Sequence, residues 1–206
     1  PRGFLFRHYE RVNMSEFDGV APPLALALAK RGYTKLTPVQ SAVLEADLQG
    51  CDLLVSAQTG SGKTIAFGMA IADAILNAAA DNARNPSPSA LIVAPTRELA
   101  LQVKRELQWL YGETPVTIAS CVGGMDIRTE RRALERGAHI VVGTPGRMRD
   151  HIMRKALKTD TIEAVILDEA DEMLDLGFRE DLEFILEATP ETRRTLLFSA
   201  TVPAGI

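Results

Sequence analysis

The feature that most constrains this chain is a glycine-rich octapeptide between an apolar run and an alanine-rich run. Residues 57–64 read AQTGSGKT, after DLLVS at 52–56 and before IAFGMAIA at 65–72. Small residues allow backbone N–H groups to point at phosphate oxygens, and a following helix adds its positive N-terminal end. We therefore predict a short buried strand, a phosphate-binding loop and a helix, rather than a flexible Gly/Ser linker.

The loop carries the side chains that a nucleoside triphosphate requires. Lys63 is expected to contact the outer phosphates, and the Thr64 hydroxyl is expected to bind magnesium. Ala57 stands where the usual pattern has its first glycine, which is a small departure. The residues predicted to contact the nucleotide are Ala57, Gln58, Thr59, Gly60, Ser61, Gly62, Lys63 and Thr64.

An acidic motif, Asp168-Glu169-Ala170-Asp171, follows the apolar run at 164–167. Carboxylates at the end of a buried strand must meet a cation or reach solvent. Asp168 is placed to hold magnesium, directly or through water, and Glu169 to orient or deprotonate the attacking water. The alternative is a solvated turn before the next helix, but the phosphate-binding loop favours the catalytic interpretation, with Lys63 as the third catalytic residue.

Composition agrees with one medium-sized globular domain. The chain has 206 residues, 46% hydrophobic and 24% charged, which suffices for a proper core. No apolar stretch is long enough to span a membrane and no secretory leader is visible, so we expect a cytoplasmic protein without a membrane partner. Cys51 and Cys121 are expected to be reduced and buried, and the three histidines form no cluster typical of a zinc site.

The net charge of −4 excludes a chain that is basic throughout, so any nucleic-acid surface must be local. One candidate is a predicted helix at 127–137 that carries Arg128, Arg131, Arg132 and Arg136. We favour the simpler interpretation, in which these arginines form a solvated face balanced by Glu130 and Glu135.

Predicted strands and helices alternate along the chain, which indicates an α/β fold with a parallel sheet covered on both faces. The carboxyl ends of such strands share one edge, where ligands bind. Strands are expected at 52–56, 90–94, 116–121, 139–143, 164–167 and 195–199. One helix is expected to begin at 65, and others to span 97–111, 127–137 and 178–188. A further helix is expected after the strand at 139–143 and ends at about 154.

The segments at those strand ends resemble, in order and spacing, the motifs of the first RecA-like domain of DEAD-box RNA helicases. The resemblance extends from Phe17 to Thr201 and implies a RecA-like P-loop fold that binds ATP or ADP with Mg²⁺. The residues GYTKLTPVQ at 32–40 resemble the Q motif of that family, in which Gln40 reads adenine. Phe17 matches an isolated upstream aromatic residue, Tyr33 is available for stacking, and Thr37-Pro38 also caps the next helix.

The resemblance further implies one side of a single-stranded RNA site that contacts backbone rather than bases. Helix starts, hydroxyls and arginines suit phosphates, although turn glycines and helix caps would explain the same residues. Asp171, Ser199 and Thr201 are expected to couple nucleotide state to RNA through hydrogen bonds. The residues expected to contact RNA are Pro95, Thr96, Arg97, Gly123, Gly124, Thr144, Pro145, Gly146 and Arg147.

The family has a second RecA-like domain with an arginine finger, which residues 14–206 do not include. We therefore expect an ATP-dependent RNA helicase whose isolated domain shows negligible RNA-stimulated hydrolysis and no unwinding. Residues 1–13 resemble nothing in the family; a non-native or disordered leader is favoured over a native extension. There are two alternative functions. One is a DNA helicase or translocase, against which Gln40 argues. The other is a nucleotide-dependent clamp, against which Glu169 argues.

Overall fold

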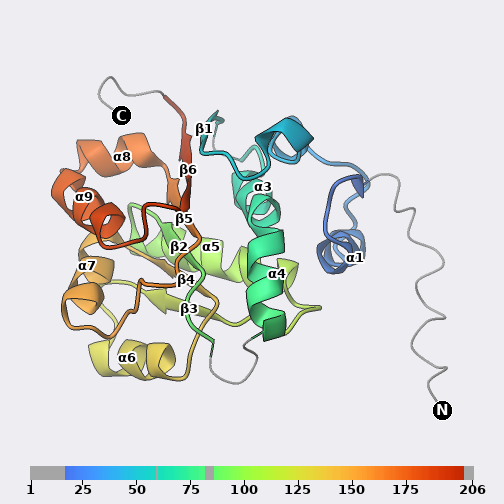
Figure 1. Ribbon diagram of the computed structural model, residues 1–206. Helices are drawn as coiled ribbons and strands as arrows, with labels where there is room; N and C mark the ends of the chain where they lie inside the picture. Colours follow the sequence, from blue (N-terminus) through green and yellow to red (C-terminus); the bar gives the residue numbers. More distant parts are fainter. Residues whose placement is uncertain (1–16, 59, 82–85, 202–206) are drawn as a thin grey trace, which may run out of the picture.

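The computed structural model describes residues 17–58, 60–81 and 86–201, and within them the predicted α/β fold is confirmed (Figure 1). All six strands run parallel, in the order β1-β6-β5-β2-β4-β3. Their carboxyl ends therefore share one edge, as predicted. The strands are β1 (Leu53–Ser56), β2 (Ala90–Val93), β3 (Ile118–Cys121), β4 (Ile140–Gly143), β5 (Ala164–Asp168) and β6 (Arg194–Ser199).

The helices alternate with these strands. Those at Pro22–Lys30 (α1) and Ala170–Asp175 (α8), and the short 3₁₀ helix at Ala46–Leu48 (η3), were not predicted. The predicted helix that begins after the phosphate-binding loop ends at Ala70, and α4 continues at an angle of 53° after Ile71. The helical segments are α1 (Pro22–Lys30), α2 (Pro38–Ala42), the short 3₁₀ helix η3 (Ala46–Leu48), α3 (Lys63–Ala70), α4 (Ala72–Asp81), α5 (Arg97–Leu110), α6 (Ile127–Glu135), α7 (Pro145–Met153), α8 (Ala170–Asp175) and α9 (Arg179–Glu187).

Two hydrophobic cores lie on opposite faces of the sheet, because successive strand residues point to opposite sides. In β2, Ile92 belongs to the core beneath α1, α3, α4 and α5, whereas Leu91 and Val93 belong to the core beneath α7, α8 and α9. Figure 1 shows these two groups of helices on the two sides of the sheet. The near-continuous apolar strands predicted from the sequence follow from this double coverage.

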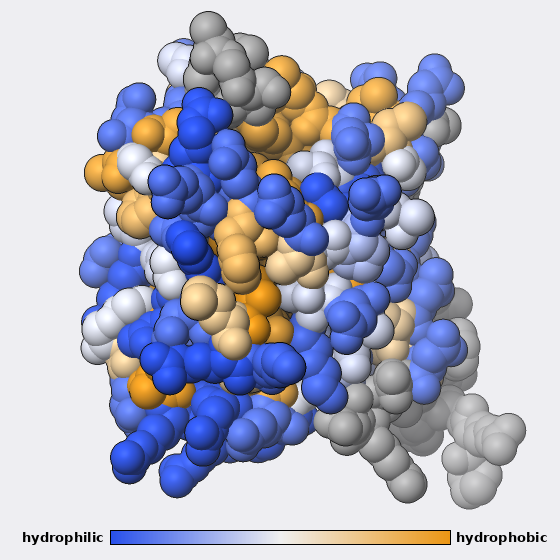
Figure 2. Space-filling model, turned by 60° about the vertical axis from the view of Figure 1, so that its left-hand side comes forward, coloured by the Kyte–Doolittle hydropathy of each residue, from blue (hydrophilic) through white to orange (hydrophobic). Residues whose placement is uncertain are grey.

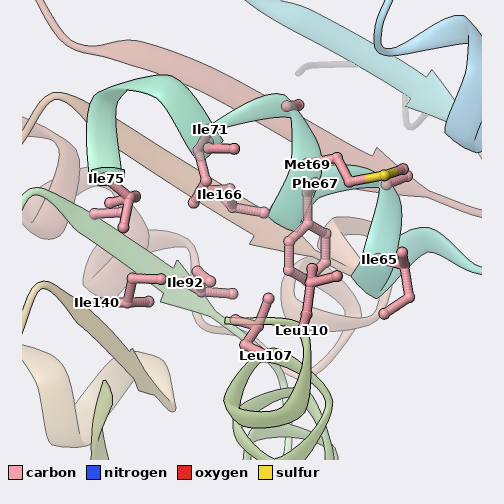
Figure 3. Packing of buried hydrophobic residues seen from close by; sticks show 14 of the residues in the cluster. Ile65, Phe67, Met69, Ile71, Ile75, Ile92, Leu107, Leu110, Ile140 and Ile166 are labelled. Carbon is pink, nitrogen blue, oxygen red and sulfur yellow. The ribbon is translucent and has the colours of Figure 1, made fainter. Parts of the chain in front are cut away.

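The first core fixes the helix that follows the phosphate-binding loop. Figure 3 shows the Phe67 ring of α3 directed toward Leu107 and Leu110 of α5. Gly68 permits this close approach, since a Cβ atom there would lie 2.8 Å from a methyl carbon of each leucine. Phe67 also meets Phe198 of β6 edge to face at 5.4 Å between ring centroids. Packing on both sides thus sets the position of α3 relative to the sheet.

The second core lies beneath a mostly hydrophilic surface. Figure 2 brings the α7–α9 side of the molecule forward and shows polar side chains interrupted by a narrow apolar band. Met148 of α7, Met173 of α8 and Ile185 of α9 are fully buried in this core. Arg149 of α7 pairs with Asp181 of α9 at 2.8 Å, which links the two helices at their surface.

Two expectations about burial are wrong. β1 lies at the edge of the described sheet and is not fully buried, because the Leu54 side chain is 54% exposed. Cys51 is exposed at the turn that precedes β1, whereas Cys121 is buried as predicted, at the end of β3. Within the described ranges, no single helix is long and apolar enough to span a membrane; only the bent pair of α3 and α4 reaches that length and composition together.

Candidate functional site

The phosphate-binding loop connects β1 to α3 at the carboxyl edge of the sheet. Its glycines are required by geometry: Gly62 has φ +88°, and a Cβ atom there would lie 2.5 Å from the Gln40 amide nitrogen. The loop is also tied to β6, because the Ala57 N–H donates to the Ser199 carbonyl at 3.0 Å. Among the predicted loop residues, Thr59 lies outside the described part of the chain.

Lys63 and the acidic motif converge above the ends of β1 and β5. The Lys63 ammonium lies 3.9 Å from Asp168 Oδ1 and 3.6 Å from Glu169 Oε1. Lys63 and Asp168 are 7% and 2% exposed, so both charges are almost removed from water. Three buried polar atoms here lack a hydrogen-bond partner: Ser61 Oγ, Lys63 Nζ and Asp168 Oδ1. Buried polar groups are normally satisfied, and such a cluster of exceptions indicates a place completed by a ligand.

The electrostatics of Asp168 agree with that interpretation. Burial raises the pKa of Asp168 to about 6; the nearby Lys63 ammonium opposes this increase and the Glu169 carboxylate adds to it. A carboxyl group whose pKa is raised by burial beside charged neighbours is typical of functional sites. Hydroxyl and carboxylate oxygens at Thr64 and Asp168 are also the hard ligands that magnesium prefers.

Glu169 has a strained backbone at this position. Its φ of 53° and ψ of 54° place a side-chain-bearing residue in the left-handed region, immediately before α8. Such a conformation costs on the order of 1 kcal/mol and persists where the surrounding structure imposes it. The turn leaves the Glu169 side chain 21% exposed beside buried Asp168, so its carboxylate can reach a water molecule.

Gln40 reaches the phosphate-binding loop from α2. Its Oε1 accepts the Thr37 N–H at 3.0 Å, and its Nε2 donates to the Gly62 carbonyl at 3.3 Å. The Thr37 hydroxyl donates to the Ser61 carbonyl at 2.9 Å. Gln40 is only 1% exposed, and its hydrogen bonds connect the phosphate-binding loop to the start of α2.

A cavity of about 490 Å³ opens from the phosphate-binding loop toward Tyr33. The Tyr33 ring lies 6.0 Å from that of Trp109, and the Arg31 guanidinium lies over Trp109 at 4.9 Å. Trp109 was not predicted to belong to this site. Its signal in the sequence is an aromatic residue of α5 that is out of phase with the buried positions Val103, Leu107 and Leu110. Phe17 does not line this cavity and is buried in the first core, 4% exposed.

The residues expected to contact RNA lie at the ends of β2, β3 and β4. Arg97 is exposed at the start of α5 and packs against Gly124, where a Cβ atom would lie 2.7 Å from Nη1. A hollow of about 300 Å³ adjoins the N-terminus of α7, which begins at Pro145 after Thr144. Its lining residues are Gly123, Thr144, Gly146, Arg147, Asp150 and Phe178.

The structure corrects the role expected for Glu130. This residue is buried, 3% exposed, and therefore does not balance a solvated arginine face. Its carboxylate accepts the Val122 N–H at 2.7 Å and lies 2.8 Å from His151 Nε2 and 3.3 Å from Arg147 Nε. Glu135, by contrast, is exposed as expected and pairs with Arg131 at 3.2 Å. Helical periodicity alone did not distinguish Glu130, because its partners come from Val122, the residue after β3, and from α7.

The predicted hydrogen bonds between the end of β6 and the acidic motif are present. Thr201 donates its N–H and its hydroxyl to Asp171 Oδ2 at 3.0 and 2.8 Å, and the Asp171 N–H donates to Ser199 Oγ at 3.3 Å. Burial acts to raise the pKa of Asp171, but the hydrogen bonds from Thr201 outweigh it and lower the pKa. Asp171 is therefore an ionised acceptor at neutral pH.

A larger cavity, of about 760 Å³, lies elsewhere, at the amino ends of β5 and β6. Its one basic lining residue, Arg194, donates to the backbone carbonyls of Leu48 and Ala70 at 3.0 and 2.8 Å. None of its lining residues carries a buried polar atom without a partner. Size alone does not make this cavity a functional site, and the carboxyl edge has the stronger chemistry.

Comparisons with known proteins agree with this geometry. The ATP-dependent RNA helicase CshA of Limosilactobacillus reuteri is 45% identical over 188 residues, which cover 91% of this chain and 37% of that protein. The DEAD-box ATP-dependent RNA helicase 9 of Oryza sativa subsp. japonica is 47% identical, over 91% of this chain and 30% of that protein. The chain thus spans about a third of the length of these curated relatives.

A solved structure and a family model give the same result. The crystal structure of a DEAD box protein from the hyperthermophile Methanococcus jannaschii matches with a TM-score of 0.80 and 39% identity, covering 89% of this chain and 49% of that one. The family model described as DEAD/DEAH box helicase matches residues 37–206. With the phosphate-binding loop, the acidic motif and the RecA-like sheet in place, the chain belongs to the DEAD/DEAH box helicase family.

Proposed function

We propose that this chain is the ATP-binding half of an ATP-dependent RNA helicase. It binds adenine nucleotide with magnesium and one side of single-stranded RNA, and in a longer protein it couples ATP hydrolysis to local unwinding. The observation that carries the proposal is the group of unpartnered buried atoms, Ser61 Oγ, Lys63 Nζ and Asp168 Oδ1. A triphosphate and a divalent cation would supply the partners that these atoms lack.

The residues of the site divide the chemistry among them. Lys63 supplies positive charge to the outer phosphates, and Thr64 and Asp168 would hold magnesium. When bound, magnesium supplies positive charge that offsets the charge of the phosphate oxygens. Glu169 orients the attacking water and accepts its proton, because its carboxylate is the more exposed of the pair. Ser199 and Thr201 hold Asp171 and so connect the acidic motif to β6.

Recognition of adenine depends on Gln40 and Tyr33. An amide side chain offers two lone pairs and two N–H bonds. The hydrogen bonds to Thr37 and Gly62 use one of each in Gln40. The remaining two match the mixed donor and acceptor edge of adenine, whereas guanine presents a different edge. Because Gln40 is buried, adenine binding requires the loop at Gly62 to shift, while Tyr33 provides a stacking surface at the cavity rim.

RNA is proposed to bind along the ends of β2, β3 and β4. Arg97 provides an exposed positive charge, and the start of α7 provides backbone N–H groups near Thr144 and Gly146. These groups contact phosphate, so no base preference is expected from this side of the RNA site. Pro95 and Pro145, which belong to the proposed RNA site, are buried next to the starts of α5 and α7.

The activity of the whole protein requires a second domain that completes both the catalytic site and the RNA site. We propose that the second RecA-like domain of the same protein supplies an arginine finger and the other side of the RNA site. Arginine fingers contribute rate factors on the order of 10³ or more, so the isolated chain is expected to hydrolyse ATP negligibly and to unwind nothing. Cytoplasmic location and the non-native character of residues 1–13 stay predictions; those residues lie outside the described structure.

Two measurements test the proposal. Isothermal titration calorimetry of the 206-residue chain should show ADP binding in the presence of magnesium and weaker binding of GDP. RNA-stimulated ATP turnover should appear when the second RecA-like domain is restored, and ribose strands should stimulate it more than deoxyribose strands. Equal affinity for ADP and GDP would exclude the adenine site. Equal stimulation by DNA would favour a DNA translocase.

A further inference from the structure

Glu130 lies at the centre of a buried polar cluster behind the RNA-facing turn at 122–125. It projects from α6 and is 3% exposed. One carboxylate oxygen accepts the Val122 N–H at 2.7 Å, immediately before Gly123. The other lies 2.8 Å from His151 Nε2, on an α7 side chain with no exposed surface. A single carboxylate of α6 therefore connects the start of this turn to α7.

The same carboxylate fixes Arg147, the basic residue nearest the turn on the α7 side. Arg147 Nε lies 3.3 Å from Glu130 Oε2, and Arg147 Nη2 donates to the Met125 carbonyl at 3.0 Å. The guanidinium thus spans from the buried carboxylate to the outer end of the turn. Its side chain is 18% exposed, which leaves part of the guanidinium accessible at the surface. On the opposite side, Arg97 packs against Gly124.

We infer that Glu130 is a positioning residue for RNA binding. It holds Arg147 and the Gly123–Gly124 turn in the geometry that receives a backbone phosphate, without touching RNA itself. The inference rests on the proposed RNA-binding function and adds to it a buried acid inside the binding wall. A planar guanidinium held at two points loses little freedom when it binds phosphate, so its preorganisation contributes affinity.

A positioning role for Glu130 and net charge alone predict opposite effects of its replacement on RNA affinity. Removing a carboxylate from a chain of net charge −4 reduces repulsion of RNA and on that basis should strengthen binding. If Glu130 positions Arg147, its replacement by glutamine should weaken binding instead. Glutamine can still accept the Val122 N–H through its oxygen, but its N–H₂ group offers no acceptor to the Arg147 guanidinium.

The test measures binding of a fluorescently labelled single-stranded RNA to the 206-residue chain at low salt. We expect Glu130→Gln to weaken binding about tenfold, as for the loss of one hydrogen bond to a charged group. Glu135→Gln is the matched control, because Glu135 lies on the same helix but is exposed and paired only with Arg131. It should bind RNA as well as the unmodified chain or slightly better. RNA binding by Glu130→Gln at or above the level of Glu135→Gln overturns the inference.

A double-mutant cycle tests whether Glu130 acts through Arg147. Each of Glu130→Gln and Arg147→Ala should weaken RNA binding, and the double variant should be no weaker than Arg147→Ala alone. Fully additive effects would contradict the inference. Arg147→Lys gives an independent test if Glu130→Gln does not fold: lysine keeps the charge but loses the two-point contact, so RNA affinity should still decrease. Unchanged affinity in Arg147→Lys overturns the inference.

Two further measurements separate failure of the inference from failure of the proposed function. Arg97→Ala should weaken RNA binding and reduce the slope of log affinity against log salt by about 0.7, the value for one phosphate on a single strand. If Arg97→Ala changes nothing, the proposed RNA wall itself is wrong. ADP affinity should be unchanged in Glu130→Gln, because the nucleotide site lies at the other end of the sheet edge. An equal loss of ADP and RNA binding would indicate general misfolding and contradict a positioning role.

Discussion

The two ends of the carboxyl edge of the sheet differ in how their charges are satisfied. At the nucleotide end, Lys63 and Asp168 are buried, and each has a polar atom without a hydrogen-bond partner. At the RNA end, the Glu130 carboxylate is equally buried but meets three groups of the protein. Only His151 Nδ1 is left unpartnered in that cluster.

This difference indicates two ways of using buried charge. Unpartnered atoms are costly to bury, so they persist where a ligand completes them. A satisfied carboxylate instead fixes the backbone around it and presents other groups outward. We therefore expect substitutions at the nucleotide end to act directly on ligand binding and chemistry. Substitutions at the RNA end should act through geometry.

The largest effect is expected for Glu169→Gln in a chain that also carries the second RecA-like domain. Loss of a general base or water-orienting group reduces turnover by about 10² to 10⁴. Nucleotide binding should be nearly unchanged, because glutamine keeps the shape of the side chain. RNA-stimulated phosphate release measures the first effect, and calorimetry with ADP measures the second. Turnover at the unmodified rate would remove Glu169 from the proposed chemistry.

The next largest effect is expected for Lys63→Ala. It removes the ammonium that faces the phosphates, which corresponds to a loss of ADP affinity of about ten- to a hundredfold. Lys104→Ala is a suitable control, because Lys104 is half-buried and hydrogen-bonded to Ser120 at 3.1 Å, away from the phosphate-binding loop. Calorimetry with ADP distinguishes them, and equal losses in the two variants would contradict a specific role for Lys63.

A smaller effect, on selectivity, is expected for Gln40→Ala. The preference for ADP over GDP should fall by roughly tenfold, the order expected for a lost pair of hydrogen bonds to a base edge. Gln49→Ala is the control, because Gln49 is exposed and bonds only to the Leu44 carbonyl at 3.4 Å. Competition between ADP and GDP for the same protein measures the preference. A preference that survives in Gln40→Ala would show that Gln40 holds the loop without reading the base.

Trp109 provides a spectroscopic test of the nucleotide end. It is the only tryptophan of the chain, and it lies 6.0 Å from Tyr33 at the cavity that opens to the phosphate-binding loop. Binding of ADP should change its emission, because the surroundings of the ring change. RNA binding to the isolated chain should leave it almost unchanged. In Lys63→Ala the change in emission should require higher ADP concentrations. If saturating ADP does not change the Trp109 emission of the unmodified chain, the adenine base does not bind in the cavity beside Trp109.

The smallest effect concerns His139 at the start of β4, away from both sites. Its Nδ1 accepts the Thr117 N–H at 3.0 Å, and burial lowers the pKa of its ring. The unfolded chain therefore takes up a proton first as pH falls below about 6.5, so stability decreases there. The slope is limited to about 1.4 kcal/mol per pH unit for one proton. His139→Asn should flatten the dependence of Tm on pH between 7 and 5, and an identical profile would contradict this origin.

Much of the fold was predictable because its signals are local. The predicted strands at 90–94 and 139–143 and the predicted helix at 97–111 agree with β2, β4 and α5 within one residue at each end. Their apolar periodicity and flanking turns depend only on neighbours in sequence. The helix predicted from residue 65 begins two residues earlier, at Lys63, directly after Gly62. α1 and α8 were missed. α8 spans only six residues, and α1 lies in the segment before the Q motif, where no helix was predicted.

The sequence by itself determined the phosphate-binding loop, the acidic motif and the order of the strands along the chain. These are contiguous patterns whose chemistry depends on adjacent residues. The tertiary structure decided the exposure of Leu54, the burial of Glu130 and the approach of Trp109 to Tyr33. Each depends on strand order or on contacts between distant helices, and side-chain periodicity does not report which element will lie opposite a given face.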